Sequence, residues 1–183
     1  MIRIIQGIYK GRFLKIPDSK VTRPTRDKVR QAIFNVIRDK TVGATCLDLF
    51  AGSGARGIEA LSRGAKIVYF NDKNRQTFQI LKENIFSLNP EKESVVLSLS
   101  DYRLFLKKYQ DVKFDLVFLD PPYKREINHD TIQRRRNRNR LSEDAIIVSE
   151  QEIENPRMEG FILKEYRYGQ KHVGIYRRGA IQK

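Results

Sequence analysis

The segment from 114 to 123 ends in residues that could hold a flat base by its exocyclic amine. It is an apolar run, Phe-Asp-Leu-Val-Phe-Leu, followed by Asp120, Pro121, Pro122 and Tyr123. A purine amine is a poor nucleophile because its lone pair is delocalised into the ring. Asp120 and the Pro121 carbonyl could each accept one N–H hydrogen bond and turn that lone pair toward an electrophile, while Tyr123 stacks on the base. The alternative is a strand that simply ends in a proline turn.

A second motif lies upstream, where an apolar run breaks into three glycines. Residues 45–57 contain Gly52, Gly54 and Gly57 in the spacing G-x-G-x-x-G. Such glycines allow a tight strand-to-helix turn and the close approach of a ligand to the backbone. Asp72 follows Gly52 by twenty positions, after another apolar run, where a carboxylate could bind ribose hydroxyls. By itself this pattern also fits a dinucleotide.

Asp48, just before the glycine turn, favours a different ligand. A carboxylate at this place would repel a pyrophosphate but could accept hydrogen bonds from an ammonium group, such as that of S-adenosylmethionine. Asp101 follows the apolar run 95–100 and could accept a hydrogen bond from the adenine amine. It is equally suited to be the N-cap of the helix expected after it. The two motifs together therefore predict S-adenosylmethionine as the cofactor.

Positive charge is concentrated in two segments. The chain has 36 Lys+Arg and 22 Asp+Glu, a net charge of +14. Residues 1–40 hold 11 basic and 3 acidic side chains, and residues 124–140 hold 7 and 2, so these segments carry +8 and +5 of the excess. A phosphate-binding rim around a catalytic turn would have this distribution, and a general solubility charge would not. The dense run 134–140 favours RNA contact over a solvated helix face.

The elements that must position these residues alternate between strand and helix. Residues 2–6 and 12–16 predict a β-hairpin that binds RNA with its exposed face or covers a sheet edge. Apolar spacing predicts a helix that begins after an N-cap at Thr25. Further helices are predicted over 57–62, around 78–85 and around 104–109, and strands over 145–148, 161–168 and 172–176. This alternation predicts an α/β fold whose mostly parallel sheet is covered on both faces.

The length and composition fit one domain in water. With 183 residues and 40% hydrophobic content, the chain is long enough for one core and short for two. No apolar run approaches the ~20 residues that span a bilayer, and no signal peptide is evident, so a cytoplasmic location is expected. Cys46 is expected to be a buried small hydrophobe. His129 and His172 lie too far apart to suggest a metal site, so no metal is expected.

These motifs together resemble a known family. The chain is similar to the class I S-adenosylmethionine-dependent methyltransferases, and more closely to the bacterial RsmD family, which methylates the exocyclic N2 of one guanine in small-subunit (16S) ribosomal RNA. The resemblance covers nearly the whole chain. Its specific part is the amino-terminal signature in residues 3–12 and 22–30, since many methyltransferases, including adenine-N6 enzymes, share the glycine loop and the Pro-Pro turn. The chemistry implied is direct in-line transfer without a covalent enzyme intermediate.

The resemblance implies a fold, a domain organisation and partners. The fold is a Rossmann-like α/β domain with a seven-stranded, mostly parallel sheet and a small amino-terminal β-hairpin extension. The hairpin and its connector occupy 1–24, and the methyltransferase domain occupies 25–183. The expected partner is small-subunit ribosomal RNA, free or in the assembled or assembling subunit, and the protein is expected to be a monomer.

The resemblance also implies roles for single residues. The implied catalytic residues are Asp120, Pro121, Pro122 and Tyr123. The implied cofactor-binding residues are Asp48, Phe50, Gly52, Ser53, Gly54, Asp72, Lys73, Asp101 and Thr25. The predicted RNA-binding residues are Arg3, Lys10, Arg12, Arg23, Arg26, Arg134, Arg135 and Arg136. Asn71 departs from the family pattern and is expected to share or alter ribose binding.

Three other functions remain open at this stage. An adenine-N6 methyltransferase acting on RNA or DNA would use the same pocket but gives no reason for the amino-terminal signature. A non-catalytic RNA-binding or ribosome assembly protein would tolerate the loss of cofactor residues, yet these residues are present. A nucleotide-dependent oxidoreductase would have to explain Asp48 and the Pro-Pro turn.

Overall fold

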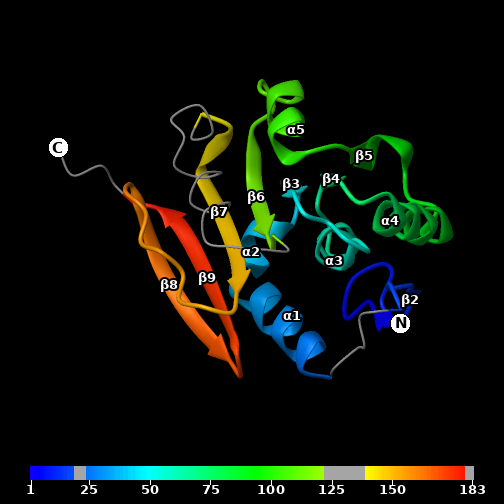
Figure 1. Cartoon of the computed structure of the whole chain (residues 1–183), viewed down its shortest axis with the longest axis horizontal. Helices are drawn as coiled ribbons and strands as arrows, with labels where there is room; N and C mark the ends of the chain where they lie inside the picture. Colours follow the sequence, from blue (N-terminus) through cyan, green and yellow to red (C-terminus); the bar gives the residue numbers. More distant parts are fainter. Residues whose placement is uncertain (19–23, 122–138, 180–183) are drawn as a thin grey trace.

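A single seven-stranded sheet forms the centre of the molecule. The computed structural model describes residues 1–18, 24–121 and 139–179. Within these ranges the sheet contains β3 (Thr45–Asp48), β4 (Ile67–Asp72), β5 (Val95–Leu99), β6 (Phe114–Leu119), β7 (Leu141–Gln151), β8 (Phe161–Tyr168) and β9 (Lys171–Arg178). Their order is β5-β4-β3-β6-β7-β9-β8 (Figure 1).

The sheet is mostly parallel, as predicted. The pairs β5–β4, β4–β3, β3–β6 and β6–β7 are parallel, whereas β9 is antiparallel to both β7 and β8. The chain proceeds from β3 outward to β5 and then returns to place β6 on the other side of β3. In open sheets of this kind, ligands bind beyond the carboxyl ends of the strands at the point where the order reverses. That point lies between β3 and β6.

Helices cover both faces of the sheet. They are α1 (Pro24–Val36), α2 (Arg38–Thr41), α3 (Ala55–Ser62), α4 (Arg75–Leu88), α5 (Tyr102–Lys108) and the short 3-10 helix η1 (Lys92–Ser94). One apolar core joins α1, α3 and α4 to the sheet through side chains such as Phe34, Ile58 and Leu81. The other joins α5 through Phe105. In the described ranges, no helix combines the length and the apolar character needed to cross a membrane.

Three details differ from the predicted elements. Helix α1 begins at Pro24, so Thr25 lies inside its first turn and not at the N-cap; proline suits this position because it lacks the N–H that would have no partner there. Helix α5 begins at Tyr102, two residues before the predicted range 104–109, because Asp101 is its N-cap. Strand β7 begins at Leu141, earlier than the predicted 145–148, because Leu141 pairs with Phe114 of β6.

The amino-terminal hairpin forms a separate two-stranded sheet. Strand β1 (Ile2–Arg3) pairs antiparallel with β2 (Phe13–Leu14), so the predicted hairpin is confirmed with shorter strands. The hairpin lies beside α4 (Figure 1) and not along an edge of the large sheet. Arg12 donates from Nη2 to the Ser87 carbonyl at 2.5 Å, and the backbone N–H of Lys15 donates to Asn84 Oδ1 at 2.8 Å. The hairpin is therefore fixed to α4.

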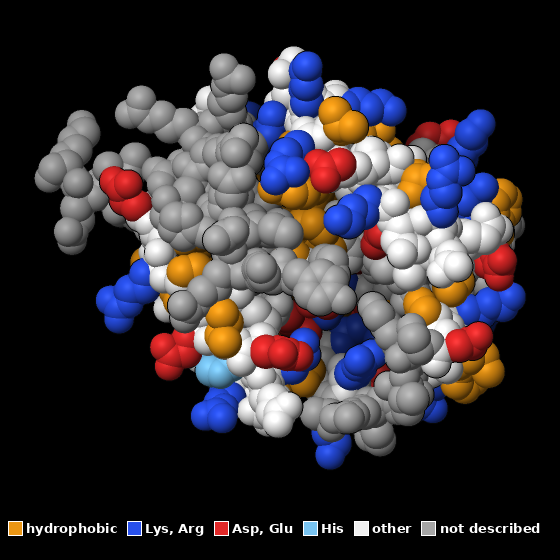
Figure 2. Space-filling model, in the orientation of Figure 1, with side chains coloured by type: hydrophobic (Ala, Val, Ile, Leu, Met, Phe, Trp, Pro, Cys, Tyr) orange, Lys and Arg blue, Asp and Glu red, His pale blue; other side chains and the backbone are white. Residues whose placement is uncertain are grey.

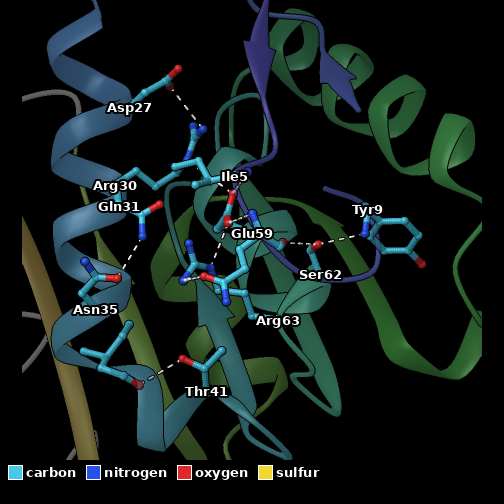
Figure 3. A network of polar contacts seen from close by, with 12 residues as sticks. Ile5, Tyr9, Asp27, Arg30, Gln31, Asn35, Thr41, Glu59, Ser62 and Arg63 are labelled. Carbon is cyan, nitrogen blue, oxygen red and sulfur yellow. Dashed lines mark hydrogen bonds and ion pairs between the residues drawn. The ribbon is translucent and has the colours of Figure 1, made fainter. Parts of the chain in front are cut away.

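A buried carboxylate, Glu59 of α3, also fixes the hairpin (Figure 3). Glu59 is fully buried, and its two oxygens accept the backbone N–H groups of Ile5 and Gln6, each at 3.0 Å. Arg63 Nε donates to Glu59 Oε1 at 2.8 Å, and Arg30 Nε lies 3.6 Å from Oε2. One carboxylate thus joins the hairpin, α1 and α3.

Candidate active site

Carboxylates from three neighbouring strands converge on the first turn of α3. Asp48 ends β3, Asp120 directly follows β6, and Glu150 lies near the end of β7. The parallel register places all three on the sheet face that α3 covers. Like charges on neighbouring strands destabilise a sheet unless a cation neutralises them. In Figure 2, acidic and basic side chains lie together in a hollow near the centre of the viewed face.

Arg56, the second residue of α3, is the neutralising cation. Its Nη2 lies 2.9 Å from Asp120 Oδ2, and its Nε lies 2.6 Å from Glu150 Oε1. Burial by itself would lower the pKa of Arg56, but Glu150 and Asp120 outweigh it and raise that pKa above its usual value. The Asp120 side chain is 34% exposed, and its contact with Arg56 uses Oδ2. A carboxylate can accept further hydrogen bonds through its other oxygen, which suits an incoming amine.

Sequence reasoning missed both Arg56 and Glu150. One signal for Glu150 was present, since it follows the buried strand 145–148 much as Asp120 follows its own strand. Arg56 stands inside the glycine motif, where the spacing drew attention to the glycines alone. Only the strand order places these two residues beside Asp120.

Asp48 is almost completely buried beneath the glycine turn. It is 2% exposed, and its Oδ2 accepts the backbone N–H of Gly57 at 3.0 Å. Burial raises the pKa of Asp48 to about 6, against the opposing effects of the Arg56 cation and the Gly57 N–H; Asp120 and Asp72 raise it further. Burial disfavours the charged form of Asp48, so a cationic ligand beside this carboxylate would be stabilising.

Asp48→Asn is expected to separate stability from ligand binding. A carboxyl with a raised folded-state pKa stabilises the fold at low pH, and this contribution is lost as pH rises from 3.8 toward about 6. Relative to the unmodified protein, the variant should therefore gain stability between pH 4 and pH 8, by at most about 3 kcal/mol. Urea unfolding at both pH values measures this gain, and calorimetry should show weaker S-adenosylmethionine binding. A constant stability difference across this range would contradict the assignment.

The glycine loop is held by Asp72. The N–H of Gly52 donates to Asp72 Oδ2 at 2.8 Å, and the N–H of Asn74 donates to Oδ1 at 2.8 Å. Gly52 and Gly54 have φ values of +57° and +88°, which favour glycine. A Cβ on Gly52 would meet no atom within 4 Å, so a ligand has room at this backbone. Asp72 is half-buried, and its Oδ1 also accepts from Thr77 Oγ1 at 3.4 Å, so Oδ2, which can accept a second hydrogen bond, is the oxygen that suits a ribose hydroxyl.

The third glycine has a packing role. A Cβ on Gly57 would lie 2.3 Å from the Phe70 ring of β4, so glycine lets α3 approach the sheet.

Gly57→Ala should lower the free energy of unfolding by about 1–3 kcal/mol. Urea unfolding of Gly57→Ala, Phe70→Leu and the double variant tests this. Crowding predicts that the double variant loses less stability than the sum of the single losses, and simple additivity would exclude crowding as the cause.

The position of Asn71 argues against direct sharing of the ribose, while an indirect effect on ribose binding stays a prediction. Asn71 is 1% exposed, because successive strand residues point to opposite faces and Asn71 faces away from Asp72. Its Nδ2 donates to the carbonyls of Leu49 and Ser100 at 3.3 and 3.1 Å, and its Oδ1 accepts from Ser100 Oγ at 2.9 Å. The amide thus links the chain just after β3 to the chain just after β5 and stabilises these two strand ends.

Other predicted cofactor residues lie around the same strand ends. Asp101 is the N-cap of α5 and accepts the N–H of Arg103 at 2.9 Å, which confirms one of its two expected roles; the adenine contact stays a prediction. The Phe50 ring packs against Tyr102, with centroids 5.7 Å apart. The Ser53 carbonyl accepts a hydrogen bond from Asn84 Nδ2, and the Lys73 side chain is exposed.

Several predicted residues lie outside the described part of the chain. These are Arg23, Pro122, Tyr123, Arg134, Arg135 and Arg136, together with the side chain of Thr25. Pro121 is described and is half-buried. Arg3, Lys10, Arg12 and Arg26 are all exposed.

The cysteine and the acidic residues give no sign of other chemistry among the described residues. Cys46 is fully buried, and burial raises the pKa of its thiol, as expected for a packed cysteine. Across residues 1–18, 24–121 and 139–179, no group of three or more His, Cys, Asp or Glu side chains is placed to hold a metal ion.

Comparison with known proteins gives consistent matches over almost the whole chain. Residues 2–177 match the family described as Conserved hypothetical protein 95. The chain is 40% identical to Ribosomal RNA small subunit methyltransferase D of Escherichia coli over 84% of this chain and 76% of that protein. It is 38% identical to Putative rRNA methyltransferase YlbH of Bacillus subtilis over 97% and 99%. The structure of Putative methyltransferase yhhF from Escherichia coli superposes with a TM-score of 0.82 at 33% identity, covering 98% of both chains.

Proposed function

Because this chain belongs to the Conserved hypothetical protein 95 family, the RsmD-type methyltransferases, we propose that it methylates the exocyclic N2 of a guanine in small-subunit ribosomal RNA. One relative is named Ribosomal RNA small subunit methyltransferase D and another Putative rRNA methyltransferase YlbH, which supports the substrate class. One observation carries the choice of an amine as the target. Asp120 is held at the end of β6 by the contact of its Oδ2 with Arg56, and a carboxylate can accept further hydrogen bonds through its other oxygen.

The residues at the strand ends fit S-adenosylmethionine, which supplies the methyl group as an electrophile. Gly52 leaves its backbone open to a ligand, and Asp72 presents a half-buried carboxylate for the ribose. The buried Asp48 and its acidic neighbours favour a ligand that carries positive charge. Asp101 at the end of β5 is the proposed partner of the adenine amine.

In the proposed reaction the protein aligns the amine more than it activates it. Asp120 Oδ1 and the Pro121 carbonyl accept the two N–H groups of the target amine, which turns its lone pair toward the methyl group. The carboxylate also stabilises the positive charge that develops on the nitrogen. The leaving group is a neutral thioether, so no strong base is needed, and the amine proton leaves to solvent. A guanine stacked in RNA must first be turned out to reach this site.

The outer face of the hairpin is the proposed RNA contact. Arg3 lies opposite Phe13 in the strand register, on the face away from the buried Ile2 and Leu14. Phe13 is 60% exposed, so a base can stack on its ring while Arg3 and the exposed Lys10 meet phosphates. Exposed cations beside an exposed aromatic ring are suited to bind the phosphates and bases of RNA.

Methyl transfer to a defined substrate tests the proposal. Labelled S-adenosylmethionine is incubated with the protein and with small ribosomal subunits, or their naked RNA, from cells lacking this activity, and the nucleosides are then analysed. N2-methylguanosine is the expected product. N6-methyladenosine would move the target to adenine, and cofactor binding without any transfer would overturn the proposal in favour of a binding role.

A further inference from the structure

The bridge between Arg56 and two carboxylates gives this site a further residue. We infer that Arg56 is a positioning residue for methyl transfer: it holds Oδ2 of Asp120 and so fixes the orientation in which the carboxylate meets the target amine. The inference rests on the proposed function, in which Asp120 is the amine acceptor. Two contacts carry it, the 2.9 Å ion pair with Asp120 and the 2.6 Å hydrogen bond to Glu150.

The geometry fixes the guanidinium more firmly than a single ion pair would. Arg56 binds Glu150 through Nε and Asp120 through Nη2, so the planar fork is held at two points. The Glu150 side chain is only 9% exposed, and the Arg56 side chain is 22% exposed. Glu150 thus holds the guanidinium from the buried side, and Arg56 in turn holds the more exposed Asp120.

Charged groups from every neighbouring element act on this pair. Asp48 of β3 interacts with both Arg56 and Asp120, and Asp72 of β4 acts on Asp48. Arg30 of α1 also interacts with Arg56, but it is paired with Glu59. Among the described residues, Arg56 is therefore the cation that directly opposes the negative charge around Asp120.

Loss of this cation has a definite consequence for the reaction. The target amine must meet the carboxylate in one orientation, so the rate of transfer depends on how firmly that orientation is held. Without Arg56, Asp120 Oδ2 loses its contact at 2.9 Å and Glu150 loses its contact at 2.6 Å. The Asp120 side chain then samples other rotamers, and the transfer step slows while binding of the substrate is unchanged.

The test measures single-turnover methyl transfer to unmodified small subunits at saturating S-adenosylmethionine, with the subunit concentration varied to separate the maximal rate from the half-saturating concentration. Arg56→Met should lower the maximal rate by about tenfold and leave the half-saturating concentration unchanged. If Arg56 acts through Asp120, Arg56→Met should cause little further loss in an Asp120→Ala background. A purely structural role would cause the same loss in both backgrounds.

Two matched variants keep the outcome clear. Arg56→Lys keeps the positive charge without the two-point contact, so it should retain more of the rate than Arg56→Met; it also serves if Arg56→Met folds poorly, as judged by thermal unfolding. Lys40→Met removes an exposed ion pair with Asp144, remote from the site, and should leave the rate unchanged. An unchanged maximal rate in Arg56→Met, or full additivity of its loss with that of Asp120→Ala, would overturn the inference. Activity of the unmodified protein in the same assay tests the proposed function separately.

Discussion

Asp120→Ala is expected to lower the rate of methyl transfer by about 10²–10³-fold while S-adenosylmethionine still binds. The alanine variant loses the acceptor that orients the amine, and it removes the partner of Arg56 at 2.9 Å. The cofactor contacts proposed for Asp48, Gly52 and Asp72 lie on other strand ends and stay in place. Single-turnover transfer from labelled S-adenosylmethionine measures the rate, and calorimetry measures binding.

The matched control is Asp120→Asn. The amide keeps one oxygen that can accept the amine N–H and loses the negative charge, so this variant should retain more activity than the alanine variant. Equal rates for the alanine variant and the unmodified protein would remove Asp120 from the reaction. Loss of S-adenosylmethionine binding in Asp120→Ala would instead place the residue in the cofactor site.

Glu59→Ala is expected to lower the free energy of unfolding by about 3–5 kcal/mol. The buried carboxylate accepts the N–H groups of Ile5 and Gln6 and neutralises Arg30 and Arg63 (Figure 3). Alanine leaves these donors and cations without their acceptor in a place that water reaches poorly. Because the hairpin is fixed through this carboxylate, the variant should also bind ribosomal RNA more weakly.

Urea unfolding measures this loss, with Glu83→Ala as the control. Glu83 also joins the hairpin to a helix, through an ion pair with Lys15, but both side chains are exposed, so little change is expected. Glu59→Gln keeps one acceptor oxygen and should fall between the two. Similar losses for Glu59→Ala and Glu83→Ala would show that burial of the carboxylate is not what fixes the hairpin.

The alternation of elements was predictable because it depends on local patterns. The apolar runs at 45–48, 67–70 and 114–119 predict buried strands, and the glycines after the first run predict a tight turn into a helix. The closing antiparallel pair β8 and β9 was also predicted from its turn. Local propensity missed the start of β7, since Leu141 is in a strand because it pairs with β6.

For the candidate site too, the residues were predictable from local patterns and their contacts were not. From the sequence alone one could identify the residues suited to bind the cofactor and the amine, because Asp48, Asp72 and Asp120 each end or follow an apolar strand next to a turn, and ligands bind beyond such strand ends. Their partners depend on the tertiary structure. Arg56 meets Asp120 and Glu150 because the strand order brings β6 and β7 beside the first turn of α3, and these contacts join residues far apart in the sequence. Asn71 shows the converse, since a one-residue step along β4 turns its amide away from the ligand and into the packing between strand ends.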